Sequence, residues 1–157
     1  MDTQTRAQDL LAFYGQLVGL PGLRFDAHGC ARLMFEESLS IDLEIDAAAG
    51  CLHAYSVLGP VPAGGREAMY RRLLEGNLFG TKTRGATLAV DGVQEEVLLC
   101  RQVDVATATA TSFAEFLADF ARIARHWRDT FASGELTVDS GADTAARELP
   151  FGMFQRA

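Results

Sequence analysis

Histidines, cysteines and carboxylates are the side chains with which this sequence could perform chemistry. The three histidines are His28, His53 and His126. They show neither HxH nor HExxH spacing, and a lone histidine is more often a surface or hydrogen-bonded residue than a ligand. The three cysteines are Cys30, Cys51 and Cys100. They lack CxxC spacing, which argues against a structural zinc site and a disulfide framework and favours a reducing compartment. We therefore predict no metal and no cofactor.

The carboxylates also give no convincing site. Asp42, Glu44 and Asp46 alternate with apolar residues, so a strand would present all three on one face. Such a face could in principle hold a hard cation, but a calcium site usually adds loop carbonyls and a glycine turn. A solvated acidic face is the favoured interpretation. Glu95 and Glu96 are adjacent, so a strand would point them to opposite faces, which suits no acid/base pair.

Motifs for nucleophilic or phosphate chemistry are missing. No serine lies in a GxSxG elbow. Gly59 and Gly64 have the spacing of a phosphate-binding loop, but Gly65-Arg66 stands where that motif needs Lys-Ser/Thr. No residue set argues for catalysis, and we predict that the protein is not an enzyme.

The composition of the chain limits the classes of partner and the location that we expect for it. The chain has 157 residues, a formal net charge of −7 and a pI near 4.9, and 48 % of its residues are hydrophobic. The acidity argues against general nucleic-acid binding and against binding to anionic lipid. The start of the chain lacks the basic and apolar regions of a secretory signal. The most apolar stretch, residues 10–23, is interrupted by Gln16 and Pro21 and is shorter than the ~20 residues of a membrane span. We expect a soluble cytoplasmic protein.

Hydrophobic periodicity predicts the elements. Apolar residues at helical spacing predict helices over residues 4–18 and 66–78. Short apolar or alternating runs predict strands over 30–35, 40–46, 51–58, 86–90 and 95–103, the last two joined by the hairpin signal Asp91-Gly92. A third helix follows a capping box of Ser112 and Glu115. Its apolar stripe comprises Phe113, Phe116, Leu117, Phe120, Ile123, Ala124, Trp127 and Phe131. The α-β-β-β-α-β-β-α order indicates an α+β fold with a twisted, mostly antiparallel sheet packed by helices.

The periodicity ends after the third helix. We predict a folded domain over residues 1–131 and a flexible tail over 132–157, where Gly, Ser, Asp and Thr dominate. Residues 149–154, Leu-Pro-Phe-Gly-Met-Phe, form an apolar segment within that tail. It is either disordered or docks on its own domain or on a partner.

One stretch resembles a known family. Residues 73–80, Leu-Leu-Glu-Gly-Asn-Leu-Phe-Gly, are followed at 85–91 by Gly-Ala-Thr-Leu-Ala-Val-Asp. These two sequences are similar to the segment between the second helix and fourth strand of the class I type III secretion chaperones, the Tir-chaperone (CesT-like) family. Residues 97–101 resemble that family's fifth strand. The element order, size and acidity also match, and the resemblance covers about residues 4–131.

The resemblance implies a homodimer without ATPase activity. Each dimer would keep the N-terminal chaperone-binding segment of one or more secreted effectors extended on its surface, soluble and competent for export. Strand addition to a sheet edge, with alternate side chains in apolar pockets, is a reasonable physical basis for such binding. The secretion-system ATPase is a further candidate partner, whereas nucleic acid and membrane are not.

The resemblance also assigns residues to two surfaces. The dimer interface would use helix 66–78 and strand 86–90, with Met69, Leu73, Leu78, Phe79, Leu88 and Val90. The effector groove would use helix 4–18 and the first three strands, with Phe13, Tyr14, Leu17, Leu33, Phe35, Ile41, Leu43 and Leu52. Pleat alternation exposes only some of these residues, so the groove set includes more than a ligand can touch.

Two other functions compete with the chaperone. A non-catalytic small-ligand-binding or regulatory α+β domain would be monomeric and would enclose a pocket. A hydrolase or transferase would bring a histidine or a carboxylate pair together in a cleft. The arrangement of the folded chain discriminates among the three.

Overall fold

The computed structural model describes residues 2–35 and 38–137. Along the chain the elements are α1 (Thr3–Leu17), β1 (Cys30–Phe35), β2 (Leu39–Asp46), β3 (Cys51–Pro60), α2 (Arg66–Asn77), the 3-10 turn η1 (Leu78–Gly80), β4 (Thr87–Asp91), β5 (Glu96–Asp104) and α3 (Ala110–Ala132). The predicted α+β class and element order are confirmed, and most element ends agree with the sequence prediction within one or two residues.

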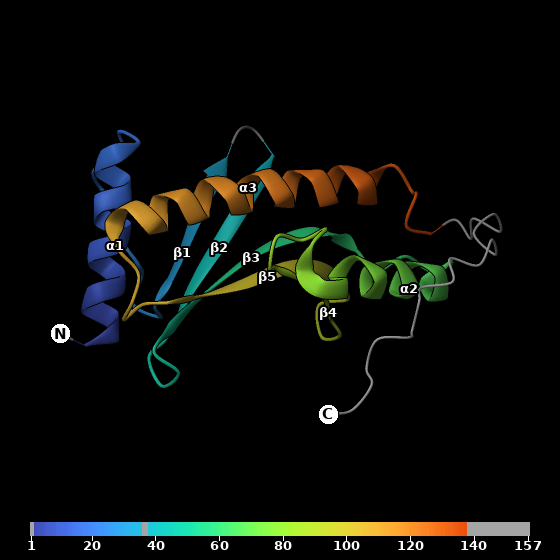
Figure 1. Ribbon diagram of the computed structural model, residues 1–157, viewed down its shortest axis with the longest axis horizontal. Helices are drawn as coiled ribbons and strands as arrows, with labels where there is room; N and C mark the ends of the chain where they lie inside the picture. Colours follow the sequence, from blue (N-terminus) through green and yellow to red (C-terminus); the bar gives the residue numbers. More distant parts are fainter. Residues whose placement is uncertain (1, 36–37, 138–157) are drawn as a thin grey trace, which may run out of the picture.

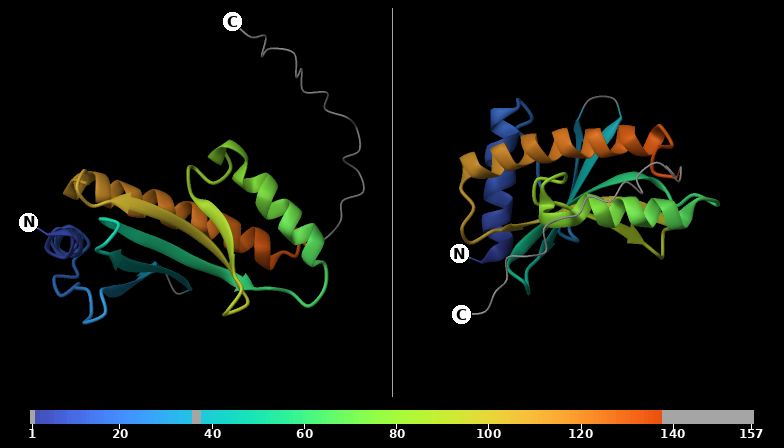
Figure 2. Two further views of the ribbon diagram at one scale, coloured as in Figure 1. Left: turned by 90° about the horizontal axis from the view of Figure 1, so that it is seen from below. Right: turned by 45° about the vertical axis from the view of Figure 1, so that its right-hand side comes forward.

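The five strands form one sheet in the order β1-β2-β3-β5-β4, with every neighbouring pair antiparallel. The edges of the sheet are therefore β1 and β4. In Figure 1, α3 runs along one face of the sheet, α1 crosses it near one end and α2 lies near the other. Figure 2 shows the same arrangement from below, with α1 seen end-on and α2 beside β4. Pleat alternation directs one set of side chains from each strand into the core beneath α3.

The helix α3 supplies much of that core. Phe113, Leu117 and Phe120 are almost completely buried, as is Trp127 near the end of the helix. Phe116, Ile123 and Phe131 from the predicted stripe are partly buried against the same cluster. The stripe was predicted from 3.6-residue periodicity, and its burial fixes the helix on the sheet.

The start of α3 corrects the sequence prediction. The capping box consists of Thr109 and Ser112, not Ser112 and Glu115, and the helix starts at Ala110. The Ser112 amide donates to Thr109 Oγ1 at 3.1 Å, and the Thr109 amide donates to Ser112 Oγ at 2.9 Å. A serine hydroxyl thus fills the place that Glu or Gln usually takes at this position. The predicted pair was wrong because an N-cap residue has extended backbone angles, and in this helix the residue with those angles is Thr109.

The β4–β5 connection is a hairpin with a longer turn than the Asp91-Gly92 signal alone implies. The turn runs over residues 92–95, and Asp91 Oδ1 accepts from the amides of Val93 at 2.8 Å and Gln94 at 3.1 Å. Glu95 closes the turn with φ 54°. The aspartate therefore organises the turn through its side chain, as Asx residues commonly do.

The packed domain extends beyond residue 131. Leu136 is buried in the core, and the Thr137 amide donates to the Gly134 carbonyl at 3.1 Å. The rest of the predicted tail, with its apolar segment at 149–154, lies outside the described residues. In the part of the chain that the structure describes, no helix combines the length and apolarity needed to cross a membrane.

Gly76 permits the close approach of α2 to the rest of the domain. A Cβ atom at this position would lie 2.6 Å from Trp127 Cη2 and 2.7 Å from Leu88 Cδ1. These neighbours belong to α3 and β4. The absence of a side chain at Gly76 is therefore what lets one residue of α2 contact both elements.

We predict that Gly76→Ala lowers the free energy of unfolding by about 1–3 kcal/mol, because the added methyl group overpacks a close contact. Gly64→Ala is the matched control, since a Cβ there meets nothing within 4 Å. Urea denaturation of both variants measures the difference. Equal stability of the two variants would contradict the packing described for α2.

Candidate protein-binding surfaces

The last turn of α1 exposes an apolar patch. One face of α1 is buried through Ala7, Leu10, Leu11 and Tyr14. The Tyr14 ring meets Phe113 edge-on with centroids 6.4 Å apart. Phe13 and Leu17 lie at the margin of that face and are exposed, Leu17 at 64 %. With Val18 and Leu20, which are also exposed, they form what we call the α1 patch.

The turn that carries Leu20 is folded tightly against α1. The Leu20 amide donates to the Gly15 carbonyl at 2.7 Å. A Cβ atom at Gly15 would lie 2.5 Å from the Leu20 carbonyl oxygen, so only glycine allows this approach. The exposed apolar side chains are thus held by a fixed turn and not by a loose chain end.

A second apolar surface lies on α2, η1 and β4. Tyr70 and Leu74 lie on a face of α2 adjacent to the one that buries Met69 and Leu73, and Leu78, four residues further on in η1, continues their spacing. Together with Phe79 and Val90 they form what we call the α2 ridge, whose members are all exposed, Leu74 at 71 %. A hollow of about 480 Å³ on this side of α2 is lined by Glu67, Tyr70, Arg71, Leu74 and Glu75.

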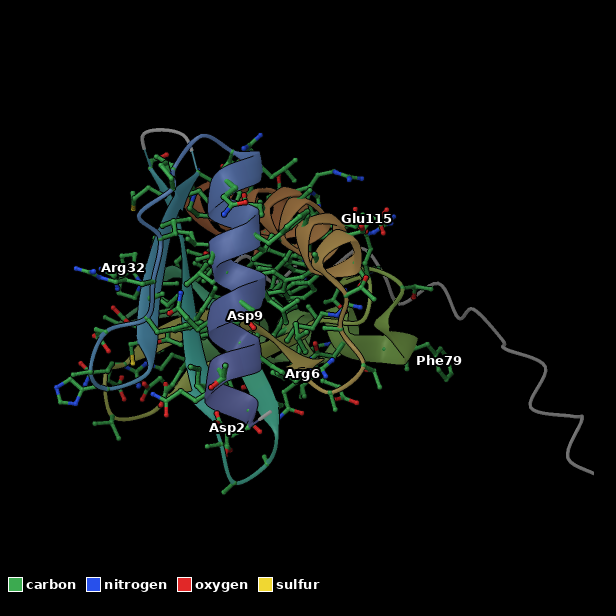
Figure 3. All side chains as sticks on the ribbon, turned by 90° about the vertical axis from the view of Figure 1, so that its left-hand side faces the viewer. Asp2, Arg6, Asp9, Arg32, Phe79 and Glu115 are labelled. Carbon is green, nitrogen blue, oxygen red and sulfur yellow. The ribbon has the colours of Figure 1, made fainter. Side chains whose placement is uncertain are left out.

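Phe79 is the most exposed residue of the ridge. Its side chain is 92 % exposed and stands out from the domain beside β4 (Figure 3). Its backbone lies in the left-handed region, with φ 56° and ψ 9°. A non-glycine residue in this region costs on the order of 1–3 kcal/mol and persists only where its surroundings impose it.

Three contacts hold the segment around Phe79. The Asn77 side chain donates to the Leu88 carbonyl at 3.0 Å and accepts from the Leu88 amide at 2.8 Å, which joins the end of α2 to β4. The Trp127 indole donates to the Lys82 carbonyl at 3.2 Å. Arg84 pairs with Asp119 of α3 at 3.3 Å. These contacts fix the backbone before and after Phe79 and so hold its ring in the exposed position.

The predicted groove residues separate into two sets. Phe13 and Leu17 are exposed and Phe35 is half-buried. The other five lie in the hydrophobic core: Tyr14, Leu33, Ile41, Leu43 and Leu52. The reason is the pleat, because Leu33 is the register partner of Ile41 and both point to the face that α3 covers. In this fold a ligand can reach only the exposed set.

The predicted dimer residues separate in the same way. Leu78, Phe79 and Val90 are exposed, whereas Met69, Leu73 and Leu88 pack inside the chain. Tyr70 and Leu74 are also exposed on α2, and the sequence prediction did not include them. The spacing of four residues between Tyr70, Leu74 and Leu78 is the signal that could have found them.

The face of the sheet that α3 does not cover is polar along β1 and β2. Asp42 accepts from Arg32 through both oxygens, at 2.6 and 3.1 Å. This hydrogen bonding raises the pKa of the Arg32 guanidinium above its usual value. The Asp46 pKa is lowered, chiefly because its carboxylate accepts from the Ala49 amide. Asp42 is buried and engaged by a cation of the same chain, so the prediction of a solvated acidic face is wrong at Asp42.

The cysteines do not have the properties of activated nucleophiles. Burial raises the pKa of the Cys51 and Cys100 thiols above the usual range, with Asp46 adding to the effect at Cys51. Burial also leads the causes that raise the pKa of Cys30. A catalytic cysteine needs a lowered pKa. The raised pKa values therefore argue against a catalytic role for these thiols.

A packed α+β domain that holds two apolar surfaces open to solvent is the structure of a protein-binding module. The chain belongs to the Tir chaperone protein (CesT) family, whose model matches residues 9–128.

Several solved protein complexes share this fold. The crystal structure of the ExsC–ExsE complex matches with a TM-score of 0.71 and 26 % identity, over 82 % of this chain and 96 % of that one. The HopA1–SchA chaperone–effector complex matches with a TM-score of 0.68 and 19 % identity, over 81 % and 96 %. The ExoU–SpcU complex of the Pseudomonas aeruginosa type III secretion system matches with a TM-score of 0.60 and 19 % identity, over 80 % and 94 %. A comparison with curated protein sequences gave no match.

We predict that the two sets of groove residues differ sharply in their effect on stability. Ile41→Ala should lower the free energy of unfolding by about 2–5 kcal/mol, because it leaves a cavity in the core. Leu17→Ala should change it by no more than about 0.5 kcal/mol, as a surface substitution does. Thermal and urea denaturation measure both. A large loss in Leu17→Ala would place that side chain in the core.

Proposed function

We propose that this protein is an ATP-independent type III secretion chaperone that acts as a homodimer. It binds the N-terminal chaperone-binding segment of one or more effectors in extended form, which keeps them soluble and competent for secretion. Membership of the chaperone family and the fold shared with chaperones solved together with effectors support this function. The chaperone works in the bacterial cytoplasm without catalysis, and the secretion-system ATPase is its further candidate partner.

The exposure of Phe79 is the single observation that carries the homodimer proposal. A phenylalanine ring held out in solvent by a strained and hydrogen-bonded backbone is stabilised only when a partner covers it. The α2 ridge is continuous with β4, an edge strand of the sheet. A second copy of the chain, related by a two-fold axis, would cover the ridge with the same residues. Obligate interfaces of this kind bury roughly 2,000 Å² or more.

The α1 patch is the proposed contact for the effector. It lies at the other end of the domain from α2, so a dimer formed through the α2 ridge leaves it open (Figure 1). The β1 strand is the second free edge of the sheet and offers unpaired backbone groups to an extended peptide. Strand addition at β1 with apolar side chains of the effector on the α1 patch follows a common mode of peptide recognition.

We predict that Phe79→Asn converts the dimer to a folded monomer. Asparagine tolerates the left-handed backbone better than phenylalanine, so the fold is retained while the exposed ring is removed. Light scattering measures the mass, and circular dichroism with thermal denaturation measures the fold. Met34→Asn is the control, since Met34 is an exposed apolar residue on β1, the opposite edge of the sheet. A Phe79→Asn protein that stays dimeric would refute the proposed interface.

We predict that Phe13→Asp loses the effector and keeps the dimer. The carboxylate places an unpaired charge in an apolar contact, which costs the complex more than the free chaperone. Co-purification with N-terminal effector fragments from the same bacterium measures binding, and light scattering measures the dimer. Val93→Asp is the control, because Val93 is an exposed apolar residue on the β4–β5 turn. If Phe13→Asp instead unfolds the domain, Phe13 is core and the α1 patch is not the binding surface.

A further inference from the structure

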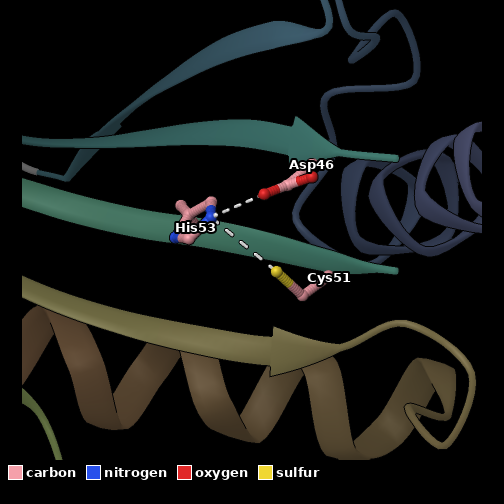
Figure 4. A group of neighbouring side chains, drawn as sticks. All are labelled: Asp46, Cys51 and His53. Carbon is pink, nitrogen blue, oxygen red and sulfur yellow. Dashed lines mark hydrogen bonds and ion pairs between the residues drawn. The ribbon is translucent and has the colours of Figure 1, made fainter. Parts of the chain in front are cut away.

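The hairpin between β2 and β3 brings together three side chains of different chemistry. Asp46 ends β2 and is the register partner of Cys51, which begins β3, while His53 lies two residues further along. His53 Nε2 lies 3.7 Å from Cys51 Sγ and 3.5 Å from Asp46 Oδ2 (Figure 4). The carboxylate, thiol and imidazole atoms all lie within 4.8 Å of one another.

This geometry does not fit a catalytic triad. In a triad the nucleophile contacts one nitrogen of the imidazole and the carboxylate contacts the other, so that a proton can pass through the ring. Here the sulfur and the carboxylate oxygen both approach Nε2. One ring nitrogen cannot serve both roles at once. Three potential ligand atoms within 4.8 Å of one another are instead compatible with a metal site.

We propose that Asp46, Cys51 and His53 bind a zinc ion. Zinc–ligand distances of about 2.3 Å to sulfur and about 2.0–2.2 Å to nitrogen and oxygen, in a tetrahedron, place neighbouring ligand atoms roughly 3.4–3.6 Å apart. The two distances from Nε2 agree with those edges within about 0.3 Å, and the third edge, from Cys51 Sγ to the Asp46 carboxylate, lies within 4.8 Å, so binding of the ion draws these two ligands together. Thiolate, imidazole and carboxylate together are a zinc donor set, and three protein ligands leave one position open.

The surroundings support a bound cation. Asp46 Oδ1 accepts from the Ala49 amide at 2.9 Å, which turns Oδ2 toward His53 and holds the carboxylate in place. Such outer hydrogen bonds orient the ligands of metal sites. Asp104 is the register partner of Cys51 on β5 and adds a second carboxylate beside the thiol. Asp46 and His53 also line an open depression of about 800 Å³, which gives the ion access from solvent.

The full-length chain, stripped of metal with a chelator, tests the proposal by titration with zinc against a chromophoric chelator. We expect one zinc ion per chain and a higher melting temperature with zinc. Cys51→Ser and His53→Gln should each weaken zinc binding by more than the ~10–100-fold that loss of an outer-shell partner typically costs. Cobalt is a spectroscopic probe of the same site, and its thiolate charge-transfer absorption should disappear in Cys51→Ser.

His28→Gln and Cys30→Ser are matched controls, because they remove the same atom types outside the proposed site. His28 lies in the exposed turn before β1, and Cys30 begins that strand. Both should bind zinc as the unmodified chain does. His53 is partly exposed, so His53→Gln keeps the fold even where a change at buried Cys51 does not. A chain that binds no zinc, or Cys51→Ser and His53→Gln proteins that bind it with unchanged affinity, would overturn the proposal.

Discussion

The packing of α3 on the sheet is the interaction on which the rest of the structure depends. Phe113, Leu117 and Phe120 fill the space between this helix and the inner face of the sheet. Burial of each such side chain contributes about 1.5–3 kcal/mol, so the stripe is a major source of the domain's stability. Residues of α3 also contact the elements that carry both apolar surfaces. Phe113 contacts Tyr14 of α1, and Trp127 bonds to the Lys82 carbonyl and packs at Gly76 of α2.

This arrangement separates two kinds of apolar surface. The α1 patch and the α2 ridge lie toward opposite ends of α3, each held by a different part of the same core (Figure 1). In the proposed function, the core between them leaves one surface for self-association and the other for an extended ligand. The net charge of −7 favours the solubility of a chain with this much exposed apolar surface.

The sequence predicted the elements better than the surfaces. The apolar stripe of residues 113–131 is long and strictly periodic, so its helix and its burial followed directly. Alternation also showed that Ile41 and Leu43 share a face, but periodicity cannot say whether a helix or a ligand covers that face. That choice depends on where α3 crosses the sheet. The exposed position of Phe79 depends in turn on contacts with Leu88 and Trp127 that are distant in the sequence.

The candidate zinc site could not be predicted from the sequence because it also depends on contacts that the fold creates. Asp46, Cys51 and His53 match no ligand spacing that is read along a single chain segment, and each residue alone is ordinary. The register of the β2–β3 hairpin brings them together, because it sets Asp46 opposite Cys51. Capping by Thr109 was missed because serine, not Glu or Gln, completes the box. Local pattern therefore determined the elements, while register and packing determined the sites.

The composition of the complex that forms inside a cell tests the central claim most directly. The full chain is co-expressed with the effectors of a type III secretion system from the same bacterium, and the purified complex is weighed by native mass spectrometry. The account predicts two copies of the 17.0 kDa chain with one effector, whose N-terminal region is protected from protease. A chain that purifies without any effector as a 17.0 kDa monomer would contradict it.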